Sequence, residues 1–175
     1  MPDSALPSVC VVGAGLAGSE AAWQVARRGR AVDLYEMRPE RGTPVHKTGD
    51  FAELVCSNTF KSNLLDTATG LLKEEMRRCG SLILKVADET RIPAGSALAV
   101  DRERFARKVT EALEAVPRIR VHREEMPAIP KEGIVILAAG PLVSESLFAD
   151  IGRFTGRDYL YFFGAVSPVI EAASI

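Results

Sequence analysis

Near the start of the sequence, glycines and one acidic residue have the types and spacing needed to hold a ligand with two phosphates. The glycines form a G-x-G-x-x-G run, which reads Gly13, Ala14, Gly15, Leu16, Ala17 and Gly18. The first glycine permits a tight turn, the second lets a pyrophosphate approach the backbone, and the third lets a helix pack closely on a sheet. Unpaired N–H groups at the start of that helix favour an anion. Glu36 lies 18 residues after Gly18, where an acid at a strand end can hydrogen-bond ribose hydroxyls.

The residues around this run predict the strand, helix and strand that such a turn requires. Val9 to Val12 is a short apolar run, typical of a parallel strand buried on both faces. The helix carries a face of small apolar residues and should end at Gly29. Ala31 to Glu36 then forms the second strand. The alternative is an empty α/β unit whose glycines serve only the turn, which leaves Gly15 and Glu36 unexplained.

A second junction of strand and glycine turn occurs late in the chain. Ile134 to Ala139 is apolar and enters a turn at Gly140. Its carboxyl end can lie beside the first turn in a doubly wound sheet, which makes Ala139 and Gly140 candidate cofactor contacts. Flavoproteins of the glutathione-reductase type commonly end a strand in this way near FAD. We therefore expect FAD rather than a nicotinamide as the resident dinucleotide, in an α/β fold with a doubly wound, mainly parallel sheet of the FAD-binding Rossmann type.

The segment from Met37 to Asp50 has prolines, glycines and no apolar periodicity, so it predicts an unusually long loop. It leaves the edge of the sheet where ligands bind, which makes Met37 a candidate cofactor contact. Arg38 could meet adenosine or phosphate charge, and a surface salt bridge is the equal alternative. His46 could contact a phosphate, the flavin or folate, against the alternative of a solvated loop histidine. Phe51 to Cys56 is a short helix or a turn.

The remaining periodicity predicts a small antiparallel excursion between the parallel strands. Thr67 to Cys79 reads as a helix that buries Leu71, Leu72 and Met76, and Gly80 should close it. Asp101 is a good N-cap for the helix that follows it. The other expected elements are strands at Leu82 to Val86, Ala97 to Val100, Ile119 to His122 and Tyr159 to Ile170, and a helix at Ser144 to Ile151.

Composition narrows the classes of protein to consider. The chain has 175 residues, 47% hydrophobic and 26% charged, with a net charge of −1, so it lacks the basic footprint of a self-sufficient nucleic-acid binder. The first residues have neither the basic region of a signal peptide nor a membrane-spanning run, which indicates the cytoplasm. Cys10, Cys56 and Cys79 fit reduced thiols and lack metal-ligand spacing, so no metal is expected. Cys10 and Cys79 are interpreted as small buried hydrophobes.

Several longer motifs resemble one family. They are Tyr35 to Pro39, Thr43 to Thr48, Phe51 to Asn58, Lys61 to Asn63, Asp101-Arg102, Ala139 to Leu142 and Phe162 to Pro168. Together they resemble the TrmFO family, the FAD- and folate-dependent tRNA (uracil-5-)-methyltransferases related to GidA. Members are much longer than this sequence. Residues 1–155 are therefore expected to form an incomplete FAD-binding domain, and 156–175 the start of an insertion or substrate domain.

The resemblance implies a cycle in which NAD(P)H reduces FAD, methylenetetrahydrofolate supplies a one-carbon unit, and uracil in the tRNA T-loop receives it. Carbon 5 of uracil becomes nucleophilic when a thiolate adds to the neighbouring ring carbon, so a cysteine near the flavin is needed. Cys56 matches the family's motif cysteine and could lie at a helix start, where a thiol pKa falls. The resemblance leaves open whether Cys56 attacks uracil or guards the flavin adduct, and the alternative to both is a buried structural cysteine.

Three other functions remain open at this point. One is a GidA-like modifier of the tRNA wobble uridine, and another is a general FAD or NAD(P) oxidoreductase. The third is a non-catalytic dinucleotide-binding fragment. The implied partners are tRNA, folate and NAD(P)H, with no membrane and no metal. The sequence leaves the oligomeric state and the choice between NADH and NADPH undetermined.

Overall fold

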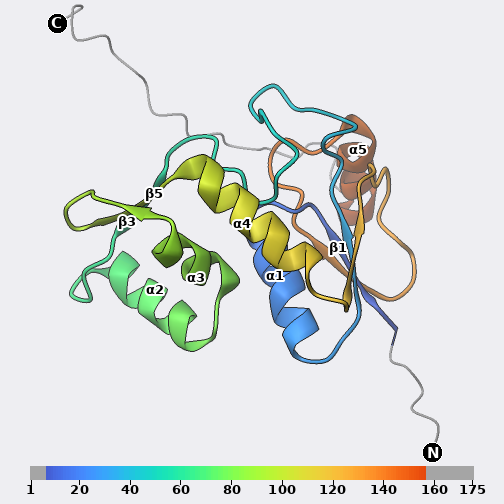
Figure 1. The fold of residues 1–175 in the computed structure, drawn as a ribbon. Helices are drawn as coiled ribbons and strands as arrows, with labels where there is room; N and C mark the ends of the chain where they lie inside the picture. Colours follow the sequence, from blue (N-terminus) through green and yellow to red (C-terminus); the bar gives the residue numbers. More distant parts are fainter. Residues whose placement is uncertain (1–6, 157–175) are drawn as a thin grey trace, which may run out of the picture.

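A computed structural model describes residues 7–156, which form a parallel sheet of four strands and an antiparallel sheet of three, with five helices (Figure 1). The predicted first unit is confirmed. β1 (Val9–Val12) leads through α1 (Leu16–Arg27) to β2 (Val32–Tyr35), and β1 pairs in parallel with β2 from Val9 to Val12. Gly29 follows α1 with a φ of +83°, so the helix ends at the predicted glycine.

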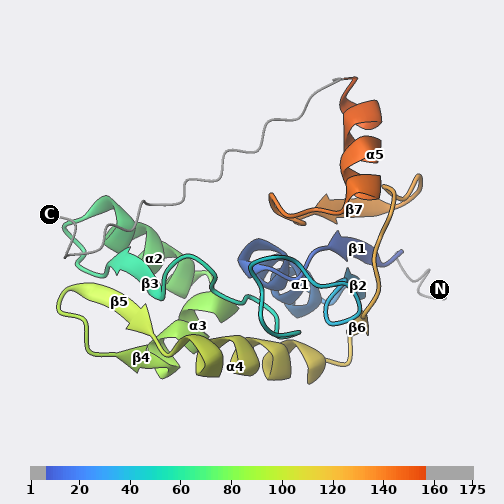
Figure 2. The ribbon, with the colours of Figure 1, turned by 90° about the horizontal axis from the view of Figure 1, so that it is seen from above.

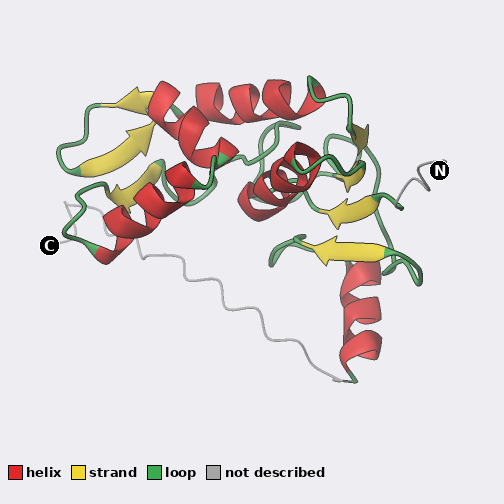
Figure 3. Ribbon diagram, turned by 90° about the horizontal axis from the view of Figure 1, so that it is seen from below, coloured by secondary structure: helices red, strands yellow, loops and turns green. Residues whose placement is uncertain are grey.

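The parallel sheet has the strand order β6-β2-β1-β7, with β6 at Ile119–His122 and β7 at Ile134–Leu137. Numbered among themselves along the chain, these strands give the order 3-2-1-4 with which the doubly wound dinucleotide-binding fold begins. α1 contacts β1, β2 and β7, and α4 (Arg102–Glu114) contacts β6, so both helices lie against one face of the sheet (Figure 3). The order reverses beside β1, which is where such sheets bind ligands.

α4 begins as predicted, because the Asp101 side chain accepts a hydrogen bond from the Arg104 N–H at 3.0 Å. Its apolar residues Phe105, Val109 and Leu113 are fully buried. β7 departs from prediction in one respect. It pairs with β1 from Ile134 to Leu137, but it is an edge strand of the sheet in the described residues, and Ile134 and Leu137 are exposed rather than buried on both faces.

The antiparallel sheet has the order β3-β5-β4, formed by Thr59–Ser62, Ala97–Val100 and Arg91–Ile92. It lies beside α2 (Ala68–Arg78) and α3 (Leu82–Glu89), away from the parallel sheet (Figure 2). The strand predicted at Leu82 to Val86 is wrong, since α3 occupies those residues. Ser81 caps this helix by accepting the Leu84 N–H at 3.2 Å, and its apolar residues pack against the core.

The helix predicted over Thr67 to Cys79 is present, but of its predicted buried residues only Met76 packs, partly buried, against the core. Leu71 and Leu72 are 51% and 56% exposed, whereas Gly70 and Lys73 are buried. A Cβ on Gly70 would lie 1.8 Å from the Leu64 carbonyl oxygen, so close backbone packing decides which face turns inward. Cys79 is exposed at the end of α2, so its interpretation as a buried hydrophobe is wrong. Cys10, on β1, is only partly buried.

The last described helix is α5 (Glu145–Thr155), which Ser144 caps and which lies beyond β7 (Figure 2). This confirms the helix predicted from Ser144. No helix among residues 7–156 is long and apolar enough to cross a lipid bilayer. The strand expected at Tyr159 to Ile170 lies outside the described residues.

Candidate functional site

A cavity of about 350 Å³ opens at the carboxyl ends of β1, β2 and β7. Its size is within the range of small-ligand sites. Ten of the predicted cofactor contacts line it, namely Gly13, Gly15, Leu16, Ala17, Glu36, Met37, Arg38, His46, Ala139 and Gly140. Ala14 and Gly18 are buried behind the lining, and Cys56 does not line the cavity. The structure thus gathers almost all of these residues in one place, while their role toward a cofactor stays a prediction.

The three glycines of the turn have different surroundings. Gly13 has a φ of +96°, and a Cβ there would lie 2.7 Å from the Ala138 carbonyl oxygen. A Cβ on Gly18 would lie 1.7 Å from the Gly13 carbonyl oxygen, so helix and turn touch there. A Cβ on Gly15 would meet nothing within 4 Å, and Gly15 borders the cavity. Neither its neighbours nor its φ of −67° requires a glycine at position 15.

Gly15 is also the N-cap of α1, and no side chain caps this helix. The first N–H groups of a helix have no partner within the helix, and they carry the positive end of its dipole. At α1 these groups lie beside the cavity, next to the space left by Gly15. The arrangement can therefore accept a phosphate group at close range.

Glu36 lies at the end of β2 with 5% of its surface exposed. Its Oε2 accepts the Ala14 N–H at 3.0 Å, and its Oε1 accepts the backbone N–H and the Nε of Arg38 at 3.1 and 2.8 Å. Burial alone would raise the pKa of Glu36, but the hydrogen bonds and charge of Arg38, with the Ala14 N–H, outweigh burial and lower that pKa. Glu36 is therefore a carboxylate at neutral pH.

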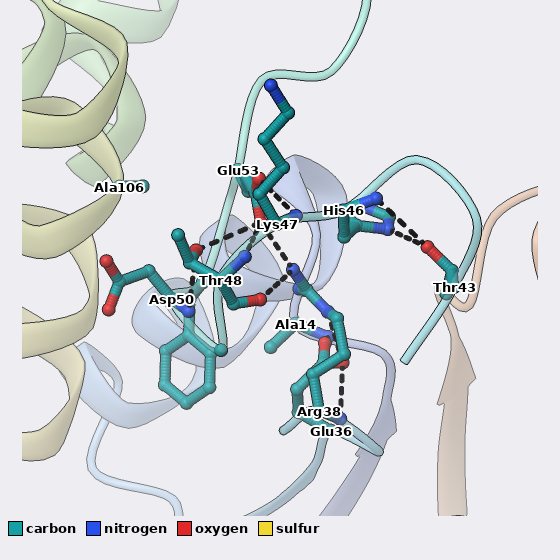
Figure 4. Close-up of polar contacts among 12 residues, drawn as sticks. Ala14, Glu36, Arg38, Thr43, His46, Lys47, Thr48, Asp50, Glu53 and Ala106 are labelled. Atoms are coloured by element: carbon teal, nitrogen blue, oxygen red, sulfur yellow. Dashed lines mark hydrogen bonds and ion pairs between the residues drawn. The ribbon is translucent and has the colours of Figure 1, made fainter. Parts of the chain in front are cut away.

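Arg38 is 3% exposed, so the alternative of a surface salt bridge is wrong. Its guanidinium pairs with Glu36, and its Nη1 donates to Glu53 Oε2 at 3.1 Å and to the Thr48 carbonyl at 3.3 Å (Figure 4). Glu53 also accepts the backbone N–H groups of Lys47 and Thr48, at 2.9 and 3.1 Å. One buried guanidinium thus joins the end of β2 to the long loop that follows it.

The predicted loop after β2 is confirmed, since residues 37–58 contain no helix or strand. Within it, the Nδ1 of His46 lies 2.6 Å from the Thr43 hydroxyl, and both residues line the cavity. Burial and the neighbouring Arg38 charge lower the pKa of His46, against the opposing charges of Glu53 and Glu36. His46 is therefore partly buried beside the cavity rather than a fully solvated histidine, and it is mainly neutral at neutral pH.

Cys56 lies in this loop, three residues before β3 begins at Thr59, and no helix starts at it. The expectation of a helix start is wrong for this reason. The alternative of a buried structural cysteine is also wrong, because Cys56 is exposed. Val55, the preceding residue, lines the cavity. The thiol is therefore exposed at the margin of the cavity.

Sequence reasoning missed two stretches of the cavity wall. Glu124, Glu125 and Met126 follow β6, and Pro141 to Ser144 with Leu147 follow β7. Glu125 accepts the Ser146 hydroxyl at 2.6 Å and pairs with Arg41. The signal was present in principle, because both stretches leave the carboxyl ends of parallel strands, the edge at which α/β sheets bind ligands. In residues 7–156, no group of three or more His, Cys, Asp or Glu side chains could hold a metal ion.

Acid should weaken the structure around Glu36 and Glu53, since hydrogen bonds outweigh burial and lower the pKa of both below the ordinary value of 4.5. The stability that these carboxylates contribute is complete above that value and is lost as the pH falls through the lowered values of the folded protein. Urea unfolding at a series of pH values measures this effect. A variant with both Glu36→Gln and Glu53→Gln should show a flatter acid dependence, and an unchanged dependence would contradict the expectation.

The strand order, the glycine turn, the uncapped α1 and the acid at the end of β2 define an α/β protein of the dinucleotide-binding class. Within that class, the chain belongs to the family described as glucose inhibited division protein A, GidA, whose sequence model matches residues 8–175. A solved structure of GidA from Aquifex aeolicus matches 76% of this chain and 22% of its own, with a TM-score of 0.57 and 19% identity. At this identity the match supports the fold alone.

More similar relatives carry a more specific name. Proteins of Lactobacillus johnsonii and Desulforamulus reducens, each named methylenetetrahydrofolate–tRNA-(uracil-5-)-methyltransferase TrmFO, are both 58% identical to the chain. The matches cover 96% and 95% of this chain and 38% of each relative. This similarity confirms the predicted resemblance. The chain spans about two fifths of the length of these relatives.

Proposed function

We propose that the chain binds FAD in the cavity at the carboxyl ends of β1, β2 and β7. The observation that carries this proposal is the open position beside Gly15, where a Cβ would meet nothing within 4 Å, next to the uncapped start of α1. A pyrophosphate fits such a cradle, because it needs close backbone approach and N–H donors. Glu36 would then accept a ribose hydroxyl.

The rest of the wall suits the other parts of a flavin dinucleotide. Ala139 and Gly140 follow β7 and lie beside Gly13, since β7 pairs with β1 and the Ala138 N–H donates to the Val12 carbonyl at 2.8 Å. Met37 continues the wall from Glu36, and His46 lies on the loop beside it. A mainly neutral His46 can donate or accept one hydrogen bond without adding charge.

We further propose that the protein takes part in methylating carbon 5 of uridine in the T-loop of tRNA, from methylenetetrahydrofolate. The support is the TrmFO name of relatives with 54–58% identity. FAD held by the cavity residues would supply the redox and one-carbon transfer chemistry, with NAD(P)H as reductant. The chain's own contribution would be the Cys56 thiolate, which adds to the ring carbon next to carbon 5 and makes carbon 5 nucleophilic. Loss of the carbon 5 proton to a base and expulsion of the thiolate would then restore the ring double bond and free Cys56. The exposure of Cys56 suits a polynucleotide substrate.

A second candidate is dinucleotide binding without methyl transfer, and one observation favours it. The matched relatives are longer, and this chain covers 38% of the proteins of Lactobacillus johnsonii and Desulforamulus reducens. Groups needed for folate or tRNA binding could belong to the other part of such proteins. We also propose that residues 1–155 form an incomplete FAD-binding domain and that residues 156–175 begin an insertion or substrate domain. The proposed location of the protein is the cytoplasm.

The two candidates give different results in one assay. The chain and a TrmFO relative of full length are each incubated with FAD, methylenetetrahydrofolate, NADH or NADPH, and tRNA that lacks T-loop methylation. Mass spectrometry of the digested tRNA then reports 5-methyluridine. We expect flavin absorbance in the purified chain and methyl transfer by the relative. Methylation by the chain supports the enzyme, flavin binding without it supports the second candidate, and loss of both contradicts the proposal.

A further inference from the structure

Hydrogen bonds around Ala14 close a ring that joins the glycine turn, the end of β2 and the long loop. The Ala14 N–H donates to Glu36, Glu36 accepts from Arg38, and Arg38 donates to Glu53. The residue before Glu53 completes the ring, because the Ala52 N–H donates to the Ala14 carbonyl at 2.8 Å. Both backbone groups of Ala14 are thus held, one through the carboxylate of Glu36 and one through the loop.

The loop side of this ring is anchored tightly. Ala52 is fully buried with a φ of +52°, a conformation that a residue other than glycine adopts only when its surroundings impose it. The Phe51 N–H donates to the Thr110 hydroxyl on α4 at 2.8 Å. Arg123 donates to the Gly49 carbonyl at 2.5 Å, and its guanidinium lies 4.1 Å from the centre of the Phe51 ring. Residues 49–53 therefore form a fixed base for Glu53.

The orientation of Glu36 depends on Arg38. A carboxylate has about four acceptor positions, two on each oxygen. In Glu36 the Ala14 N–H occupies one position on Oε2, and Arg38 occupies both on Oε1. The remaining position is on Oε2, on a residue that lines the cavity. Without Arg38, the carboxylate could turn and form other hydrogen bonds.

Such a buried cluster is poorly explained by stability alone. A guanidinium and two carboxylates lose much hydration on burial, and apolar residues of similar volume often stabilise a fold equally well. The side chains of Arg38, Glu36 and Glu53 are only 4%, 6% and 10% exposed. The cluster touches the predicted ribose position rather than the centre of the core.

We propose that Arg38 and Glu53 are positioning residues that aim the free acceptor of Glu36 at a ribose hydroxyl of the bound dinucleotide. This inference rests on the proposed dinucleotide site. Arg38 restrains Oε1, and Glu53 restrains Arg38 from the fixed loop. Neither residue needs to contact the ligand. Their role can therefore be measured as the difference in affinity between two ligands that differ only in the ribose hydroxyls.

The test compares the binding of ADP and 2′,3′-dideoxy-ADP to flavin-free protein by isothermal titration calorimetry. The unaltered protein should prefer ADP by about 10- to 100-fold, the contribution of a hydrogen bond to a charged group. Glu53→Gln and Arg38→Met should reduce this preference to less than about 3-fold, because the acceptor is no longer held. Arg38→Lys should keep an intermediate preference, since an ammonium can reach one carboxylate but cannot span two.

Asp88→Asn is the matched control, because it removes the carboxylate charge from the exposed pair of Asp88 with Arg77 and lies outside the ring. Its preference for ADP should be unchanged. Circular dichroism checks that each variant is folded, and Glu53→Gln, which keeps the shape of the side chain, serves if Arg38→Met does not fold. Equal weakening of both ligands in the variants would overturn the positioning role and leave a structural one. If the unaltered protein binds ADP and 2′,3′-dideoxy-ADP equally well, the positioning role is overturned but dinucleotide binding is not. If the protein binds neither ADP nor FAD, the positioning role and the proposed dinucleotide site are both overturned.

Discussion

Cys56→Ala should lower the rate of tRNA methylation by several orders of magnitude and leave FAD bound. The expectation applies to the methylating protein under the proposed function, in which the thiolate forms a covalent bond to uracil. Removing a covalent nucleophile generally has an effect of this size, because no other group forms that bond. Melting temperature, flavin absorbance and methylated tRNA should be measured on one preparation.

The exposure of Cys56 makes this experiment easier to interpret. Replacement of an exposed residue usually changes stability by less than about 0.5 kcal/mol, so a lost activity would not reflect unfolding. Cys79→Ala is the matched control, since Cys79 is also exposed but follows α2, away from the cavity lining. Near-normal methylation by Cys56→Ala would exclude an essential role for this thiol.

Gly15→Val should weaken FAD binding by about 100-fold or more and leave the fold intact. A Cβ at this position meets no protein atom within 4 Å, so the branched side chain would extend into the space where the phosphates should bind. A fluorescence titration of flavin-free protein with FAD measures the effect, and circular dichroism checks the fold.

Two other glycines serve as controls for Gly15. Gly42 also has open space at its Cβ position but does not line the cavity, so Gly42→Val should keep normal FAD affinity. Gly18→Ala should instead destabilise the protein itself, because its Cβ would lie 1.7 Å from the Gly13 carbonyl oxygen. Undiminished flavin binding by Gly15→Val would contradict the placement of the pyrophosphate.

The parts of the fold that could be predicted are those that local chemistry determines. The glycine turn, the acid at Glu36 and the N-cap at Asp101 each have a short-range cause that the sequence displays. The run from Leu82 to Val86 was misassigned because a short apolar segment fits a buried strand and a buried helix equally well. In α2, the packing of Gly70 on the Leu64 backbone decides the buried face, and this contact depends on tertiary structure.

In the candidate site too, the features set by local sequence could be predicted and those set by tertiary structure could not. Most of the predicted residues that line the cavity lie at the glycine turn and the strand ends, where local sequence is enough to find them. The ion pair of Arg38 with Glu53 could not be predicted, because it joins residues 15 apart through an irregular loop. No periodicity describes such a loop, so its return to the strand end could not be foreseen. The wall contributed by Glu124 to Met126 leaves a strand end at the expected edge of the sheet, but its place beside β2 follows from topology rather than from local pattern.

The ring around Ala14 also affects the thermodynamics of ligand binding. Its hydrogen bonds all join atoms of the protein itself, so the turn, Glu36 and residues 49–53 lose their conformational entropy when the protein folds. A dinucleotide bound at the proposed site would have fewer groups to immobilise, and more of its contact energy would remain as affinity. Folding and recognition therefore share a single ordering step.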